Sequence, residues 1–284
     1  MTLRILRTLD EVVSFEKETH RAGHRLALVP TMGFLHQGHV SLMREARGQA
    51  QVVAVSIFVN PTQFGPQEDL ARYPRDLEGD VEKCRGAGVA VVFAPQPSEV
   101  YPPGAQTFVE VTELQQGLCG ARRPGHFRGV ATVVTKLFTL FRPEIAFFGE
   151  KDYQQLQVIK RLNRDLHLGV QVVGSPTIRE PDGLAMSSRN VYLSVDERRR
   201  ALSLSSGLKD ARTLASQGVV DAAALVAAVR ARLAEAEVRV DYVELVDAET
   251  LVPLSSLASG QPARLLVAAF LGNTRLIDNV GVGG

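Results

Sequence analysis

The first strand-to-helix turn of the chain reads PTMGFLHQGH, at residues 30–39, and we name this segment the HxGH turn. It follows a short apolar run at 26–30 and precedes a helical pattern that starts near His39. Such a turn points the N–H groups and the positive end of the helix at the sheet edge, where an anion binds well. Gly33 and Gly38 let the backbone approach a ligand closely. Because His36 and His39 can both bond to phosphate oxygens, the segment predicts a phosphate site.

Other interpretations of the HxGH turn remain open from these residues alone. His36 and His39 could be ordinary surface histidines, or two ligands of a metal ion, although no third ligand is close in sequence. The dinucleotide fingerprint GxGxxG and the phosphate loop GxxxxGK[ST] are both absent from the sequence. That absence argues against a simple NAD enzyme and a phosphate-loop NTPase.

The chain around this turn alternates apolar runs with helix-length segments as far as residue 175. Continuous apolar runs are typical of strands covered on both faces, and strand–helix alternation predicts a parallel sheet with helices on both sides. We therefore expect a Rossmann-like α/β domain whose ligands bind beyond the carboxyl ends of the strands. The expected strands are 26–30, 52–60, 89–94, 145–148 and 170–174, and the expected helices are 39–49, 74–86, 129–141 and 152–168.

The pattern changes near Ser175, where Pro176, Pro181 and Gly183 predict a domain boundary or hinge. We expect a domain at 1–175 and a smaller α+β domain at 176–284. The second contains helical spacing at 201–211 and 225–233, with Asp221 as a helix N-cap, and strand-like runs follow. These runs are 240–246, 263–270 and 275–280, and residues 281–284 are expected to form a loose tail.

Composition excludes several classes of protein. The 284 residues carry 32 Lys and Arg against 31 Asp and Glu, a formal charge of +1, so bulk attraction to nucleic acid is not expected. With 45% hydrophobic residues the chain is not expected to be disordered, and its apolar runs are far shorter than the roughly 20 residues of a membrane span. Asp10 and Glu11 interrupt the start of the chain before a signal peptide can form, so we expect a cytoplasmic protein. The only two cysteines, Cys84 and Cys119, have no metal-site spacing.

A second motif, MSSRN at 186–190, places hydroxyls beside Arg189, whose guanidinium can bind phosphate in a bidentate manner. Alone it is a common loop sequence. Together with the HxGH turn it resembles the paired motifs of the class I nucleotidyltransferase superfamily. Enzymes of that superfamily bind ATP and direct attack at its α-phosphate.

Three more segments lie at expected strand ends or helix starts. NPTQF at 60–64 contains Gln63, whose amide suits a substrate with hydroxyl and carboxylate groups. FFGEKD at 147–152 offers Lys151 as a second cation, with Gln155 one helical turn later. RPGHFRG at 123–129 is basic and glycine-rich. Each also has an ordinary alternative, a helix start or a charged loop without a role in binding.

Six blocks in this order, PTMGxLHxGH, FVNPTQFG, RYPRD, RPGHFRGVATVV, FFGEKDYQQ and DGLAMSSRN, resemble the pantoate–β-alanine ligase family. The resemblance runs from about residue 5 to residue 280. It implies a nucleotide-binding α/β domain and a smaller domain that closes over the site. The implied reaction is ATP-dependent condensation of (R)-pantoate with β-alanine through a pantoyl adenylate, in coenzyme A biosynthesis. A cytoplasmic homodimer that uses Mg²⁺ with ATP is also implied.

The resemblance assigns roles by position. Gln63 and Gln155 would bind pantoate, with Gln63 also near β-alanine, and Asp80 matches an acidic position associated with the Mg²⁺ that accompanies ATP. His39 would be the residue labelled proton donor. The implied catalytic residues are His36, His39, Lys151, Ser187, Ser188 and Arg189. The implied ATP-binding residues are Met32, Gly33, Phe34, Leu35, His36, Gln37, Gly38, His39, Gly149, Glu150, Lys151, Asp152, Ile178, Met186, Ser187, Ser188 and Arg189.

This chain departs from the family pattern at three positions. Phe34 stands where a small residue is usual, Ile178 where valine is common and Asp76 where threonine is common.

Two other functions remain open beside that of the ligase. One is another adenylate-forming or nucleotidyl-transferring enzyme of the HxGH superfamily, and the other is a non-catalytic nucleotide-binding regulator on the same fold.

Overall fold

The computed structural model describes residues 2–66 and 68–283, which form two compact units. The first comprises Met1–Gln116, Gly120–Glu150 and Gln155–Pro176. The second comprises Gly117–Cys119, Lys151–Gln154 and Thr177–Gly284, so it includes two short segments that precede residue 177 in the sequence. The expected domain boundary between residues 175 and 176 stays a prediction. Over the described residues, no helix combines the length and the apolar character that crossing a membrane requires.

The first unit is built on a six-stranded sheet in the order β1-β4-β3-β2-β5-β6, in which every pairing is parallel. This confirms the expected α/β class. From β2 the chain adds β3 and β4 on one side and β5 and β6 on the other, so the order reverses between β2 and β5. The HxGH turn follows β2, which places it at this switch point. The strands are β1 (Arg4–Leu6), β2 (Leu26–Thr31), β3 (Val52–Ile57), β4 (Val91–Phe93), β5 (Ile145–Gly149) and β6 (Gln171–Ser175).

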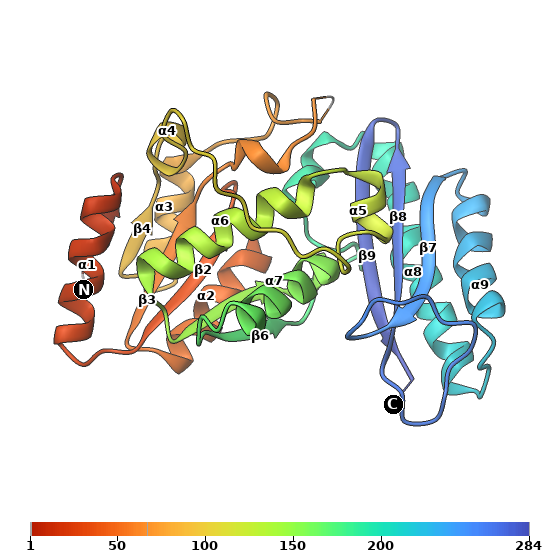
Figure 1. Ribbon diagram of the computed structural model, residues 1–284. Coiled ribbons are helices and arrows are strands. Elements are labelled where there is room, and N and C mark those ends of the chain that lie inside the picture. The colour runs from red at the N-terminus through yellow and green to blue at the C-terminus, as the bar shows by residue number, and fades with distance from the viewer. Residues whose placement is uncertain (1, 67, 284) are drawn as a thin grey trace. The chain divides into compact units, whose positions relative to one another are not determined.

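Helices cover both faces of this sheet (Figure 1). On one face, Met43 of α2 packs in a cluster with Val29 and Val55. On the other face, Phe141 of α6 packs edge to face against Phe93 of β4, with ring centroids 5.9 Å apart. Alternate strand residues therefore serve opposite layers, as continuous apolar strands require. The helices are α1 (Leu9–Arg21), α2 (Gln37–Gln49), α3 (Leu77–Gly86), α4 (Pro97–Val100), α6 (His126–Phe141) and α7 (Tyr153–Asp165), whose first two residues belong to the second unit.

The second unit packs two helices against an antiparallel sheet in the order β7-β8-β9, which confirms a smaller α+β part (Figure 1). Asp221 caps α9 as expected, because its carboxylate accepts the Ala224 N–H at 2.9 Å. The loose tail expected from residue 281 is wrong for Gly281 and Val282, since both pair with β8 and Val282 is buried. The elements are α5 (Leu118–Arg122), which begins in this unit, α8 (Val195–Ser216), α9 (Ala222–Glu235), β7 (Arg239–Asp247), β8 (Ala263–Leu271) and β9 (Thr274–Val282).

Candidate functional site

The two histidines of the HxGH turn form a reciprocal cap at the start of α2. The Gly38 N–H donates to Nδ1 of His36 at 3.1 Å, and the His36 N–H donates to Nδ1 of His39 at 3.2 Å. A ring nitrogen that accepts from a backbone N–H carries no proton, so each neutral imidazole is protonated at Nε2. The ring centroids lie 4.1 Å apart. The cap therefore fixes two neighbouring rings in the tautomer that donates from Nε2.

The segment before these histidines is held by Asp80 of α3. The Asp80 carboxylate accepts the Phe34 N–H at 2.7 Å and the Leu35 N–H at 2.6 Å. The backbone here is left-handed, with φ of +83° at Gly33 and +49° at Phe34. A side chain at Gly33 would also crowd Ile57 Cγ2, 2.9 Å from the position of an added Cβ. Asp80 thus stabilises a conformation that is unfavourable for Phe34.

The resemblance associates Asp80 with Mg²⁺, whereas in the structure its carboxylate is enclosed by groups of the protein. The side chain is 1% exposed, and burial raises the pKa of its carboxyl although the Leu35 and Phe34 N–H groups oppose the rise. Lys83 Nζ lies 3.6 Å from Oδ1. Within residues 2–66 and 68–283, no group of three or more His, Cys, Asp or Glu could hold a metal ion. These contacts do not fit a direct metal ligand, and the link to Mg²⁺ stays a prediction.

Gln63 follows β3, at the end of a short 3-10 helix, Pro61–Gln63, and its amide is oriented from two sides. Asn60 Nδ2 donates to Oε1 of Gln63 at 3.1 Å, and Nε2 of Gln63 contacts the sulfur of Met32 at 3.1 Å. Nδ1 of His126, at the start of α6, donates to the Gln63 carbonyl at 2.8 Å. The structure therefore brings Gln63 beside the HxGH turn. Asn60 and His126 stood in the quoted segments, but their anchoring role was not foreseen.

A salt bridge between Arg123 and Glu68 supports His126. Arg123 donates from Nη1 to Nε2 of His126 at 3.1 Å and from Nε to Glu68 at 2.9 Å. Burial alone would raise the pKa of Glu68, but the Arg123 hydrogen bond and charge lower it overall. The RPGHFRG segment thus contributes a partly buried network that fixes Gln63.

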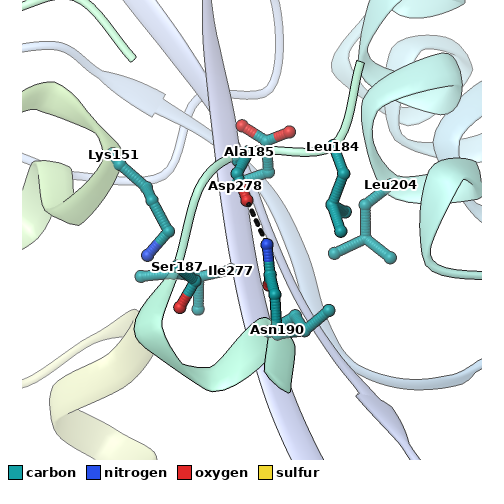
Figure 2. A pocket seen from close by; sticks show the side chains of 9 residues that line it. Lys151, Leu184, Ala185, Ser187, Asn190, Leu204, Ile277 and Asp278 are labelled. Carbon is teal, nitrogen blue, oxygen red and sulfur yellow. Dashed lines mark hydrogen bonds between the residues drawn. The ribbon is translucent and has the colours of Figure 1, made fainter. Parts of the chain in front are cut away.

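In the second unit, Lys151 and Ser187 line one pocket together with Asn190 and Asp278 (Figure 2). The Lys151 amino group and the Ser187 hydroxyl point toward the same side of that pocket. Ser187 also caps the 3-10 helix Ser188–Tyr192 by accepting the Arg189 N–H at 3.3 Å. Lys151 and Ser187, two expected phosphate-binding positions 36 residues apart in sequence, therefore line one pocket, and Ser187 is hydrogen-bonded to the backbone of Arg189.

The segments at Ile178 and Met186 are the two sides of a hairpin. The Met186 N–H donates to the Ile178 carbonyl at 3.0 Å, and Asn190 Nδ2 donates to the Ala185 carbonyl at 3.2 Å.

The candidate residues are divided between the two units. The second unit contains Lys151, Asp152, Ile178 and residues 186–189. The first unit contains the other candidates: residues 32–39, Gln63, Asp80, Gly149, Glu150 and Gln155, which lies half-buried in the first turn of α7.

Comparison with known proteins agrees with the expected family. The family model described as pantoate-beta-alanine ligase matches residues 4–281. A pantothenate synthetase of Myxococcus xanthus is 68% identical over 285 residues, covering 100% of this chain and 98% of the relative. A crystal structure of the Thermus thermophilus enzyme has 48% identity and a TM-score of 0.94, covering 99% of this chain and 100% of the other. The Francisella tularensis pantoate-beta-alanine ligase, described in complex with β-γ ATP and β-alanine, has 32% identity and a TM-score of 0.82, covering 98% and 97%. The chain therefore belongs to the pantoate–β-alanine ligase family, whose members are ligases that form a carbon–nitrogen bond.

Proposed function

We propose that this chain condenses (R)-pantoate with β-alanine through a pantoyl adenylate, releasing pyrophosphate and then AMP. The observation that carries the proposal is the reciprocal cap of His36 and His39, in which each Nδ1 accepts a backbone N–H and Nε2 is left as the donor of the neutral ring. It lies at the start of α2, where the helix dipole also attracts anions. The identity of the substrates is proposed from membership of the pantoate–β-alanine ligase family.

In the first step, a carboxylate oxygen of pantoate attacks the α-phosphorus of ATP. The bond from this phosphorus to the oxygen that bridges it to the β-phosphorus breaks, and pyrophosphate leaves. Negative charge grows on the phosphate oxygens. Nε2–H of His36 and of His39 donate to those oxygens, and Lys151 and Arg189 add positive charge, with hydroxyls from Ser187 and Ser188. The other residues of the ATP-binding set act by contact with the nucleotide. Gln63 and Gln155 hold pantoate through its hydroxyl and carboxylate groups.

Mg²⁺ that accompanies ATP would neutralise part of the negative charge of the phosphates. The chain's own contribution is the set of hydrogen-bond donors described above. We assign Asp80 to the support of the HxGH turn because both of its oxygens accept backbone N–H groups.

In the second step, the neutral amine of β-alanine attacks the acyl carbon of the adenylate, and AMP departs with the bridging oxygen. The amine loses its proton to water or to a substrate group, so no dedicated base is required. His39 keeps its proton on Nε2 and donates a hydrogen bond to the departing phosphate. We assign this hydrogen bond as the proton-donor role that the family resemblance implies for His39. Because acyl adenylates hydrolyse readily, we also propose that movement of residues 176–284 about the 174–183 segment excludes water.

The experiment is exchange of labelled pyrophosphate into ATP without β-alanine. The proposal expects exchange that depends on pantoate and stops when pantoate is omitted. An enzyme that makes pantothenate from all three substrates but shows no exchange would contradict the adenylate route. A regulator would bind ATP without exchange or turnover, and a related nucleotidyltransferase would fail to use pantoate.

A cytoplasmic homodimer remains part of the proposal through the family resemblance. Sedimentation analysis of the purified chain tests the dimer, because a monomer and a dimer of this 30.9 kDa chain sediment differently. Fractionation of the source cells tests the location. No nucleic acid or membrane partner is proposed, in line with the formal charge of +1.

A further inference from the structure

Strand β9 carries two adjacent buried polar residues, Asp278 and Asn279, that the proposed reaction does not use. They are 2% and 3% exposed. Neighbouring residues of a strand point to opposite faces of the sheet. Burying a carboxylate and an amide is unfavourable unless each is hydrogen-bonded, so their partners indicate what these positions do.

Asn279 holds the backbone of Lys151. Its Nδ2 donates to the Lys151 carbonyl at 2.9 Å, and its Oδ1 accepts from Nε of Arg264 at 2.6 Å. The Arg264 guanidinium lies 4.2 Å from the centroid of the Tyr153 ring. This face of β9 therefore fixes the turn that carries Lys151 by both a direct hydrogen bond and a cation–π contact.

Asp278 holds the segment that leads to Ser187 and Arg189. It forms a two-bond pair with Arg179, Nη1 to Oδ2 at 2.6 Å and Nη2 to Oδ1 at 2.9 Å. Arg179 Nη1 also donates to the Gly183 carbonyl at 3.1 Å, across the hairpin that ends at Met186. A bidentate pair fixes orientation as well as distance. Asp278 therefore fixes the position of the hairpin from which the chain continues to Ser187 and Arg189.

The two anchors are themselves joined, because the Asn279 N–H donates to Oδ1 of Asp278 at 2.8 Å. Lys151, Ser187 and Asp278 line the same pocket (Figure 2). We infer that Asp278 and Asn279 are positioning residues. They hold Lys151 and the Ser187–Arg189 segment in the relative positions that the phosphates of a single ATP require. This inference rests on the proposed function.

The sharpest test is the near-isosteric change Asn279→Asp. It removes the donor to the Lys151 carbonyl but keeps an acceptor for Arg264. Asp278→Asn weakens the other anchor by removing its charge. Each variant is expected to lower pantoate-dependent exchange by on the order of 10²-fold, the effect of misplacing reacting groups by about 1 Å. The KM for ATP should rise while the KM for pantoate stays unchanged, a split that general loosening of the unit does not predict.

The matched control is Asp241→Asn, which weakens a comparable Arg–carboxylate pair in the same sheet. Arg275 binds Asp241 through Nε at 3.0 Å and Nη2 at 2.9 Å. The control should lose thermal stability without the ATP-specific change in KM. If Asn279→Asp or Asp278→Asn fails to fold, Arg179→Gln breaks the link from its more exposed side, where the side chain is 32% exposed, with the same expected result.

The outcomes separate the two ideas. If the wild-type protein shows no pantoate-dependent exchange, the proposed function fails. If the wild type exchanges and the folded variants keep its rate and its KM for ATP, only the positioning role is overturned. A change in KM that Asp241→Asn reproduces also overturns it.

Discussion

Replacing Asp80 with asparagine tests how the HxGH turn is held. The carboxylate accepts two short hydrogen bonds, from the Phe34 and Leu35 N–H groups, while the backbone is left-handed at Gly33 and Phe34. Asparagine has nearly the same shape but only one oxygen. Its amide group therefore faces one of the two N–H groups and leaves that N–H without an acceptor.

The magnitude follows from these contacts. Hydrogen bonds to a charged group contribute about 1.5–3 kcal/mol each, and an unsatisfied buried N–H costs about 1–3 kcal/mol. Against this, burial raises the pKa of the Asp80 carboxyl, so the variant is relieved of an ionised group that is unfavourable in this environment. We expect a net loss of about 1–3 kcal/mol of unfolding free energy. We also expect exchange activity to fall on the order of 10²-fold as His36 and His39 move.

Two measurements separate this account from a direct Mg²⁺-binding role. The melting temperature of Asp80→Asn should fall without ATP or metal, by about 2–4 °C for each kcal/mol lost. Raising the Mg²⁺ concentration should not restore the exchange rate. Wild-type stability of the metal-free variant, together with recovery of its activity at high Mg²⁺, would refute the anchoring role.

Three other predictions concern the same fold. His39→Asn keeps an acceptor near the Nδ1 position and loses the Nε2 donor, so exchange should fall by about 10²–10³-fold with little loss of stability; His39→Gln should retain more activity, and equal rates would count against the Nε2 donor. Gly129→Ala places a Cβ against the backbone of Thr62 and Gln63 and should cost about 1–3 kcal/mol in urea unfolding, whereas Gly48→Ala meets open space and should not destabilise. Hydrogen bonds from Thr250 and Gln261 lower the pKa of Asp247 from 3.8 to about 2, so the ionised group stabilises the fold above pH 3.8 and this contribution is lost toward pH 2. Asp247→Ala should therefore lower the melting temperature at pH 7, with a difference that shrinks below pH 4; a constant difference would contradict the assignment.

Much of the fold was predictable because its central strands are continuous and apolar. The run at 52–60 was expected and β3 spans Val52–Ile57, while the run at 89–94 became β4. The first strand was missed, since β1 has three residues and only Leu6 is buried. Helix α1 was also missed, although Thr8 and Glu11 form a capping box that was readable in the sequence.

The candidate site was less predictable in its supporting contacts than in its motifs. The HxGH turn and MSSRN are local patterns, so their residues stand out in the sequence. The anchors Asp80, His126 and Asn279 act on the backbone of segments 46, 63 and 128 residues away, and no local pattern records such pairings. The reciprocal cap of His36 and His39 also required coordinates, because it depends on which ring nitrogen faces the backbone.

The most direct test of the adenylate route uses pantoate labelled with ¹⁸O in its carboxylate, together with ATP and β-alanine. If a carboxylate oxygen attacks the α-phosphorus, that oxygen remains on phosphorus when the amine displaces AMP. The account predicts one ¹⁸O in each AMP formed, detected by mass spectrometry. Pantothenate formation with unlabelled AMP would contradict the route and remove the role proposed for His36 and His39.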